Sequence, residues 1–234
     1  IMIVMIAGAI NDDSGSSTAT AELGEEQVAS YVFSINAGQS ASIAENTAAT
    51  TAVMTVAVTD GPATGCSISS GATDVDSDGN APFAISSSCA ITVNDAGDLN
   101  YESQTSFTLS ILATDGSGNA DVGTVTISVT DVNDQTPAVT VAATYNHAEA
   151  AATTFQTYTI VDTDTSGTYT CTLGGTDAAD FSASISGKVC TVTWAANPDY
   201  ETPADSGGNN VYDITIAFSD GTNDLAAQTT AITV

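Results

Sequence analysis

The stretch SFTLSILATDG, residues 106–116, alternates apolar with polar side chains. Phe107, Leu109, Ile111 and Ala113 occupy every second position, and a period of two places them on one face of a pleated strand. The Asp-Gly pair at the end is typical of a turn. The sequence therefore predicts a half-buried β-strand that ends in a tight turn.

The same alternation recurs before and after this stretch. Short strands separated by Gly, Asp, Asn and Ser are typical of a β-sandwich, and no long stretch shows a helical period. Three further sets of residues are expected to share a face: Met54, Val56 and Val58; Val125, Ile127 and Val129; and Tyr212, Ile214, Ile216 and Phe218.

The two halves of the chain repeat each other. LNYESQTSFTLSILATDG at 99–116 corresponds to PDYETPADSGGNNVYDITIAFSDG at 198–221, and cysteines, Tyr-Glu pairs and Asp-Gly pairs follow in the same order. Pro137 interrupts strand pairing between the halves. The fold class is therefore all-β, with two tandem Greek-key β-sandwiches. The expected boundaries are 1–28 for an N-terminal apolar strand and linker, 29–136 for the first domain and 137–234 for the second.

The charge is strongly one-sided. The chain has 28 Asp and Glu, a single Lys or Arg, and a net charge of -27. Binding to nucleic acid or to an anionic membrane needs Lys and Arg, so these partners are excluded. No segment approaches the roughly 20 apolar residues of a membrane-spanning helix. Such a surface needs cations, and composition alone does not distinguish a salt-adapted surface from divalent-cation sites.

Four cysteines form two pairs, one in each predicted domain. Cys66 and Cys89 are 23 residues apart, and Cys171 and Cys190 are 19 apart. The absence of a C-x-x-C motif and the presence of only one histidine, His147, argue against zinc. We interpret the pairs as the disulfides Cys66–Cys89 and Cys171–Cys190, in an oxidising compartment. Four buried thiols are the alternative.

Oxygen-bearing side chains lie at predicted strand ends and in the segment between the domains. Calcium takes six to eight oxygen ligands, mostly carboxylates and carbonyls. The first domain offers Glu45, Glu102, Asp131, Asn133 and Asp134, and the second offers Asp162, Asp164 and Asp220. Ordinary solvated turn residues are the alternative interpretation.

The motifs DVNDQTP at 131–137, DTD at 162–164 and NYE at 100–102 occur in an order that resembles cadherin repeats, including the cadherin-like domains of microbial surface proteins. The resemblance covers roughly residues 35–234. It implies a calcium cluster at the domain junction. Asn100 stands where the family usually has Asp, and Gln135 where it usually has Asn, so two or three ions are expected.

The resemblance also implies unfinished half-sites at the outer ends of the two domains. Glu149, Asp199 and Glu201 would form one at the far end of the second domain. Asp60 and Asp115, which follow strands, would form the other at the near end of the first domain. A neighbouring repeat or subunit would complete each of them.

Residues 1–10, IMIVMIAGAI, are almost purely apolar. Their length matches one β-strand, and an apolar strand favours an open sheet edge. In another copy of the chain, Ile1, Ile3, Val4, Met5 and Ile6 would form a donor strand and build a head-to-tail filament. Asn11, Asp12 and Asp13 would then add ligands beside Asp199 and Glu201. The alternatives are a signal-peptide core, a strand of the same chain, or the end of a preceding repeat.

The sequence favours a binding or structural role over catalysis. His147 lacks a nucleophile motif such as G-x-S-x-G, and the chain has few aromatic residues for a sugar-binding cleft. We expect an extracellular filament or surface subunit, rigidified by calcium, whose partners are copies of itself. The alternative is a fragment of a calcium-dependent cell-surface adhesin whose partners are other surface proteins.

Overall fold

The computed structural model describes residues 32–149, 151 and 153–234. Residues 34–130 form one β-sandwich and residues 144–233 form a second. The strands of the first are β1 (Ser34–Ile35), β2 (Gln39–Ala44), β3 (Ala52–Thr55), β4 (Val58–Thr59), β5 (Ala63–Ser70), β6 (Phe83–Ile85), β7 (Ala90–Val93), β8 (Ser106–Asp115) and β9 (Ala120–Thr130).

The second sandwich repeats this order. Its elements are β10 (Thr144–Asn146), β11 (Thr154–Thr159), β12 (Thr170–Gly174), the 3-10 turn η1 (Ala178–Asp180), β13 (Phe181–Ser186), β14 (Val189–Trp194), β15 (Val211–Ser219) and β16 (Asp224–Thr233). Within the described part of the chain, no helix has the length and apolar character needed to cross a membrane.

Each sandwich contains a four-stranded and a three-stranded sheet, and the first sandwich also has the two-stranded sheet β1-β4. The four-stranded sheets have the orders β2-β9-β8-β5 and β10-β16-β15-β12, and the three-stranded sheets β3-β7-β6 and β11-β14-β13. One pair in each larger sheet is parallel, β2 with β9 and β10 with β16, and the other pairs are antiparallel. The four-stranded and three-stranded sheets thus share one topology in the two sandwiches, as the sequence repeat predicts.

The predicted core faces are confirmed. Phe107, Leu109, Ile111 and Ala113 are at most 1% exposed, and they pack with Val125, Ile127 and Val129 in the first core. In the second core, Trp194 packs on Phe181 with ring centroids 4.2 Å apart. Alternate burial along the strands therefore closes each sandwich over its own apolar layer.

The stretch 54–58 differs from a single strand. Strand β3 ends at Thr55 and strand β4 begins at Val58. The two short strands pair with different partners, β3 with β7 and β4 with β1. Val56 lies between them, 3% exposed, and donates its N–H to Cys89 O. Burial of Met54, Val56 and Val58 toward one core is retained although the ladder is interrupted.

Both predicted disulfides are formed, and each joins the two sheets of one sandwich. Cys66 lies on β5 and bonds to Cys89, which directly precedes β7. Cys171 on β12 bonds to Cys190 on β14. The Cα atoms are 5.2 and 6.1 Å apart. These bonds support the predicted oxidising compartment.

Neighbouring residues on β8 test this architecture. Ile111 is fully buried, whereas Leu112 is 36% exposed. We expect Ile111→Ala to lower the free energy of unfolding by about 2–5 kcal/mol because it leaves a cavity in the core. Leu112→Ala should cost about 1 kcal/mol or less. Chemical denaturation measures both, and equal losses would contradict the assigned faces.

Candidate functional site

Strand ends and the segment after β9 carry the eight predicted junction residues. Glu45 directly follows β2, and Glu102 lies in the loop 94–105 between β7 and β8. Asp131, Asn133 and Asp134 follow β9. The remaining three, Asp162, Asp164 and Asp220, lie in the loops that follow β11 and β15.

Glu45 fixes one side of the site. It is 3% exposed, and its carboxylate accepts hydrogen bonds from the N–H groups of Tyr101 at 2.7 Å and Val132 at 2.6 Å. One side chain thereby ties the end of β2 to the loop that carries Glu102 and to the segment after β9. It brings carboxylate oxygens of Glu45, Glu102 and Asp131 within 4.8 Å of one another.

Glu102 and Asp164 bring unpartnered negative charge to the same place. Carboxylate oxygens of Glu102, Asp134 and Asp164 lie within 4.8 Å of one another. Both oxygens of Glu102 and Oδ1 of Asp164 are buried without a hydrogen-bond partner among the described residues. Buried carboxylate oxygens without a donor are costly, and a bound cation would satisfy them.

Asn133 adds a further oxygen. Its side-chain oxygen lies 2.9 Å from Oδ2 of Asp164 and 2.9 Å from Oδ2 of Asp220. Three acceptor oxygens in contact repel one another. Either rotation of the amide, which would present its N–H groups to both carboxylates, or a cation between the three oxygens relieves this repulsion.

Hydrogen bonds hold the other carboxylates in place. Asp131 accepts from the N–H and hydroxyl groups of Thr165 and Ser166, and Asp220 accepts from the N–H groups of Thr222 and Asn223. Burial raises the pKa of Asp131 and of Asp220, but these hydrogen bonds outweigh it, so both pKa values are lowered. Both groups are therefore ionised near neutral pH.

Two further predicted ligands accept hydrogen bonds beside the cluster. Asp162 accepts the N–H of Asp164 at 3.1 Å and the hydroxyl of Tyr169 at 3.0 Å. Asp134 accepts an amide N–H from Asn46 at 2.5 Å and from Gln135 at 2.6 Å. The structure thus brings all eight predicted junction residues into one neighbourhood, where their role as ligands stays a prediction.

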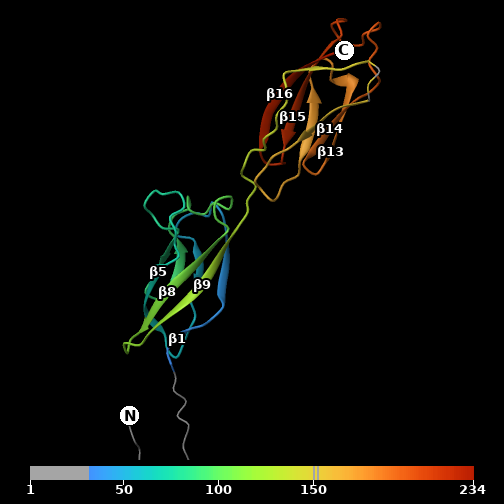
Figure 1. Cartoon of the computed structure of the whole chain (residues 1–234). Coiled ribbons are helices and arrows are strands. Elements are labelled where there is room, and N and C mark those ends of the chain that lie inside the picture. Colours follow the sequence, from blue (N-terminus) through green and yellow to red (C-terminus); the bar gives the residue numbers. More distant parts are fainter. Residues whose placement is uncertain (1–31, 150, 152) are drawn as a thin grey trace, which may run out of the picture. The chain divides into compact units, whose positions relative to one another are not determined.

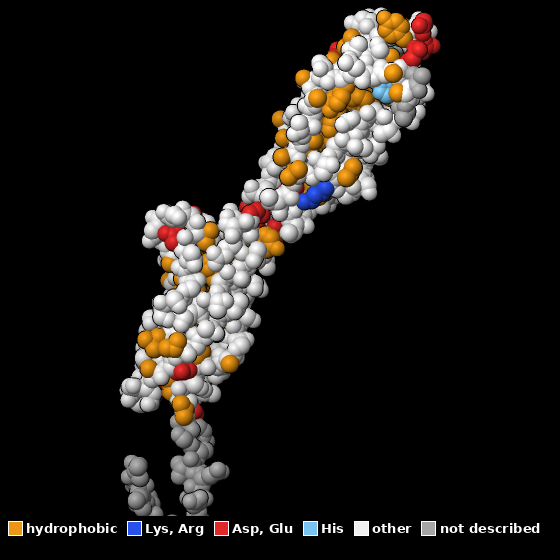
Figure 2. Space-filling model, in the orientation of Figure 1, with side chains coloured by type: hydrophobic (Ala, Val, Ile, Leu, Met, Phe, Trp, Pro, Cys, Tyr) orange, Lys and Arg blue, Asp and Glu red, His pale blue; other side chains and the backbone are white. Residues whose placement is uncertain are grey.

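The single basic side chain does not neutralise the cluster. Lys188, the blue side chain in Figure 2, donates from Nζ to the carbonyl oxygens of Asp162 at 2.9 Å and Asp164 at 3.4 Å. It also lies 5.2 Å from the centre of the Tyr169 ring. One ammonium group that is engaged with backbone carbonyls cannot balance the carboxylates that meet here, and the sequence contains no other Lys or Arg.

The predicted outer half-sites differ in how far they are assembled. Carboxylate oxygens of Glu149, Asp199 and Glu201 lie within 4.8 Å of one another on exposed residues. Glu149 accepts the N–H of Tyr200 at 3.0 Å, as Glu45 accepts that of Tyr101, so the motif repeats in the second sandwich.

The half-site predicted at the near end of the first sandwich rests on Asp60 and Asp115. The carboxylate of Asp115 accepts hydrogen bonds from Ser117 and Asn119 in its own turn, which lower its pKa although burial raises it. Asp60 has a positive φ of 61° and precedes β5. Metal binding at either half-site stays a prediction.

A second acidic cluster was missed by the sequence analysis. Asp74, Asp76 and Asp98 form one group of carboxylates within 4.8 Å, and Asp76, Asp78 and Asp95 form another. The motif DVDSDG at 74–79 was the available signal, because alternating Asp residues followed by Gly are typical of calcium-binding loops.

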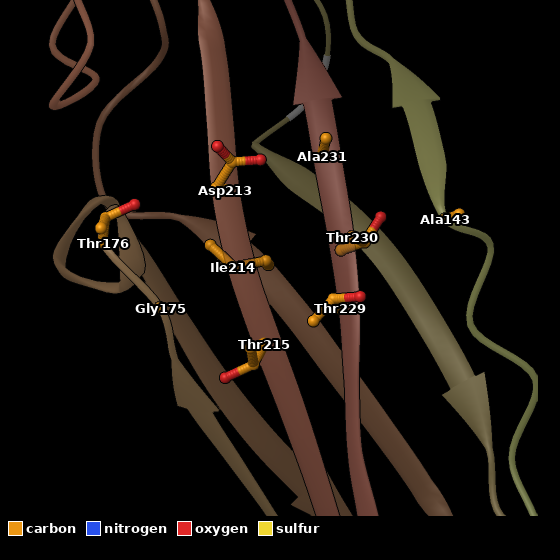
Figure 3. Close-up of a pocket in the computed structure, with 9 residues that line it drawn as sticks. All are labelled: Ala143, Gly175, Thr176, Asp213, Ile214, Thr215, Thr229, Thr230 and Ala231. Atoms are coloured by element: carbon orange, nitrogen blue, oxygen red, sulfur yellow. The ribbon is translucent and has the colours of Figure 1, made fainter.

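The groove in Figure 3 shows no constellation for acid–base catalysis. It lies beside β15 and β16, and Asp213 is the only ionisable residue among the nine that line it. His147 lies elsewhere, with its ring centre 5.2 Å from that of Trp194 and 6.4 Å from that of Phe155, and burial lowers its pKa. Its surroundings are thus aromatic.

The predicted donor strand at residues 1–10 and the linker to residue 28 lie outside the described residues.

Comparison with known proteins agrees with the fold of the two sandwiches. Residues 39–130 match the family model described as the cadherin domain. The fold is cadherin-like. The chain is similar to human desmocollin-1 ectodomain, with a TM-score of 0.68, 16% identity, and coverage of 87% of this chain and 41% of that one.

Two protocadherin structures are also similar. For protocadherin gamma B2 domains 3–6 the TM-score is 0.59 and the identity 19%, over 85% of this chain and 45% of that one. For the protocadherin gammaB7 EC3-6 cis-dimer they are 0.60 and 18%, over 84% and 45%. The chain thus spans less than half the length of these structures. No curated protein matches it in sequence.

The pKa of Glu102 gives a test of the junction without calcium. Burial, followed by the negative charges of Glu45 and Asp164, raises this pKa from 4.5 to about 7. Between these values the folded state binds a proton that the unfolded state releases, so the contribution of Glu102 to stability falls as pH rises through about 7.

In chelator, the melting temperature of the native chain should therefore fall between about pH 4.5 and about pH 7, and that of Glu102→Gln should fall less because its side chain is neutral throughout. The variant controls for general repulsion among the other acids. Parallel pH curves for the two proteins would show that Glu102 does not titrate in this way.

Proposed function

We propose that this chain is a calcium-stiffened module of an extracellular cell-surface protein that takes part in adhesion, and that it has no catalytic role. The observation that carries the proposal is the convergence of Glu102, Asp134 and Asp164. Oxygens of Glu102 and Asp164 are buried there without a hydrogen-bond partner among the described residues, and the single Lys of the sequence cannot balance the charge. Calcium is the cation that suits six to eight oxygen ligands of this kind.

The residues would hold calcium from both sides. Glu45, Glu102, Asp131 and Asp134 would bind from the first sandwich and the segment that follows it, and Asn133 would add its side-chain oxygen. Asp162, Asp164 and Asp220 would bind from the second sandwich. The bound ions would replace mutual repulsion by shared coordination, and the segment between the sandwiches would lose its freedom to flex.

An adhesive role is supported by the cadherin-like fold and by the two disulfides, which suit an extracellular compartment. One of the similar structures is a protocadherin cis-dimer, so a second copy of this chain is a reasonable partner, alongside other cell-surface proteins. The expected microbial type of the repeat stays a prediction.

The filament hypothesis depends on residues 1–10, of which the structure describes nothing, so the adhesion module is the function that the described residues favour. Electron microscopy separates the two. Filaments of the full chain in calcium that vanish on deletion of residues 1–10 would support donor-strand assembly. Identical single particles from both proteins would leave the adhesion module alone.

Calcium should stabilise the folded chain. At a free calcium concentration one hundred times the dissociation constant, a single site adds about 2.7 kcal/mol to the free energy of unfolding. Melting followed by circular dichroism, in calcium and in chelator, measures this gain. Asp164→Asn should reduce this gain, and Asp213→Asn, an exposed change of the same charge, should keep it. Coinciding melting curves in calcium and in chelator would refute the calcium site.

Adhesion has its own readout. Beads coated with the full chain should aggregate in calcium and disperse in chelator if two copies recognise each other. Beads coated with Asp164→Asn should aggregate less. A chain that gains stability in calcium but never aggregates beads would retain the stiffening role and would show that its partner is a different surface protein.

A further inference from the structure

Two loops meet at one end of the first sandwich. Residues 71–82 connect β5 to β6, and residues 94–105 connect β7 to β8. Figure 1 shows the loops at this end, where β9 also ends. Asn94 donates its N–H to Pro82 O and its amide to Ala81 O, both at 2.8 Å, and thereby fastens the two loops together.

The first loop carries the sequence DVDSDGN at 74–80. Asp74, Asp76 and Asp78 alternate and are followed by Gly79, which matches positions 1, 3, 5 and 6 of the calcium loop D-x-D-x-D-G. Gly79 has a φ of +98°, the left-handed conformation that the turn at this position requires. Asp74 accepts the N–H groups of Ser77 at 2.6 Å and Gly79 at 2.9 Å, so the loop is folded back on its own carboxylate.

Asp98 of the second loop completes the group and points independently to a ligand. Its side chain is 0% exposed, and a carboxylate oxygen lies within 4.8 Å of oxygens of Asp74 and Asp76. Oδ1 accepts the N–H groups of Val75 and Asp76, but the buried Oδ2 has no hydrogen-bond partner among the described residues. A buried carboxylate oxygen that has no donor, on a side chain beside two other carboxylates, requires a cation or a proton.

No protein group supplies that cation. Five carboxylates gather here, from Asp74, Asp76, Asp78, Asp95 and Asp98. The only Lys or Arg of the sequence is Lys188, which donates to backbone carbonyls in the second sandwich. The loops also approach closely, because a Cβ atom at Gly97 would collide with Oδ2 of Asp76. The carboxylates are thus held together without a compensating charge.

We propose that Asp74, Asp76 and Asp98 bind a calcium ion within the first sandwich, separate from the junction, with Asp78 and Asp95 as adjoining ligands. An EF-hand loop takes its last ligand from a Glu at position 12, where this chain has Ile85. The second loop fills that role here. The ion therefore fastens two loops of one sheet end rather than closing one loop on itself.

The site borders the junction through a shared loop. Asp95 and Asp98 lie near the start of this loop, residues 94–105, and Glu102 lies near its end. Between them, Leu99 is fully buried, and its carbonyl oxygen accepts the N–H of Asn46. Calcium bound by Asp74, Asp76 and Asp98 would order the segment that presents Glu102 at the junction. The two sites are nevertheless built from different ligands, so the proposal does not depend on the junction site.

The test counts calcium ions bound to the full chain. Titration with calcium chloride, followed by calorimetry, should show that Asp98→Asn binds one ion fewer than the native chain, and that the control Asp213→Asn binds the native number. In two-dimensional NMR spectra, the amide signals of Gly79 and Gly97 should shift with calcium in Glu102→Gln, which lacks a junction ligand, and should no longer shift in Asp98→Asn.

Stability separates a ligand from a merely structural residue. In chelator, Asp98→Asn should melt at or above the native temperature, because it removes an unpaired buried charge and keeps the Oδ1 acceptor. In calcium it should melt below the native chain. Asp76 is exposed, so Asp76→Asn provides a second variant that keeps the core intact, and it should also lose one ion.

An unchanged ion count in both Asp98→Asn and Asp76→Asn would overturn the proposal, whatever the junction binds. So would a loss of melting temperature in Asp98→Asn that is the same in chelator and in calcium. If calcium shifts the Gly79 and Gly97 signals but does not bind at the junction, the proposed function is refuted and this site remains.

Discussion

Repulsion among carboxylates that the fold forces together is the constraint on which this structure depends. The buried carboxylate of Glu45 accepts hydrogen bonds from backbone N–H groups of two segments, and it places Glu102 and Asp131 beside each other. Asp164 and Asp220 then meet the amide oxygen of Asn133. A chain with one Lys and no Arg has no internal means of balancing such a centre, so its charge has to be matched from the solvent. The acidic composition and the position of the acids at strand ends thus have the same consequence, which is a need for cations from the solvent.

Periodicity was sufficient to predict the fold because each sandwich has one buried face per strand. Phe107 to Ala113 and Tyr212 to Phe218 alternate without interruption, and the structure buries these residues. The stretch 54–58 shows the limit of this reasoning. Its apolar residues keep the period of a single strand, yet around Val56 the backbone leaves the three-stranded sheet and then pairs with β1 in a separate two-stranded sheet. Hydrogen-bond partners, which a period does not encode, decide where such a strand ends.

The candidate junction site was predictable because its motifs occur in a fixed order across the two repeats. The acidic cluster within the first domain was less predictable because its ligands come from one domain. The cysteine pairs and the junction residues recur at matching places in both halves. Asp98 had no such counterpart: its burial, and the contact of its loop with Asp74 and Asp76, follow from the closing of two loops that are distant in sequence. The stretch DVDSDG was visible in the sequence, but its completion by a second loop is a product of the tertiary fold.

The two disulfides have a mechanical consequence for this chain. Each bond joins the opposed sheets of one sandwich, from β5 to the turn before β7 and from β12 to β14. A pulling force applied to the chain ends would pass through these covalent bonds. The residues between each cysteine pair, 66–89 and 171–190, would bear no load and would not extend. Even after its strands had been peeled apart, each sandwich would therefore release only part of its contour length. A reducing environment would free the remainder, so the extensibility of the chain would depend on the redox state of its surroundings.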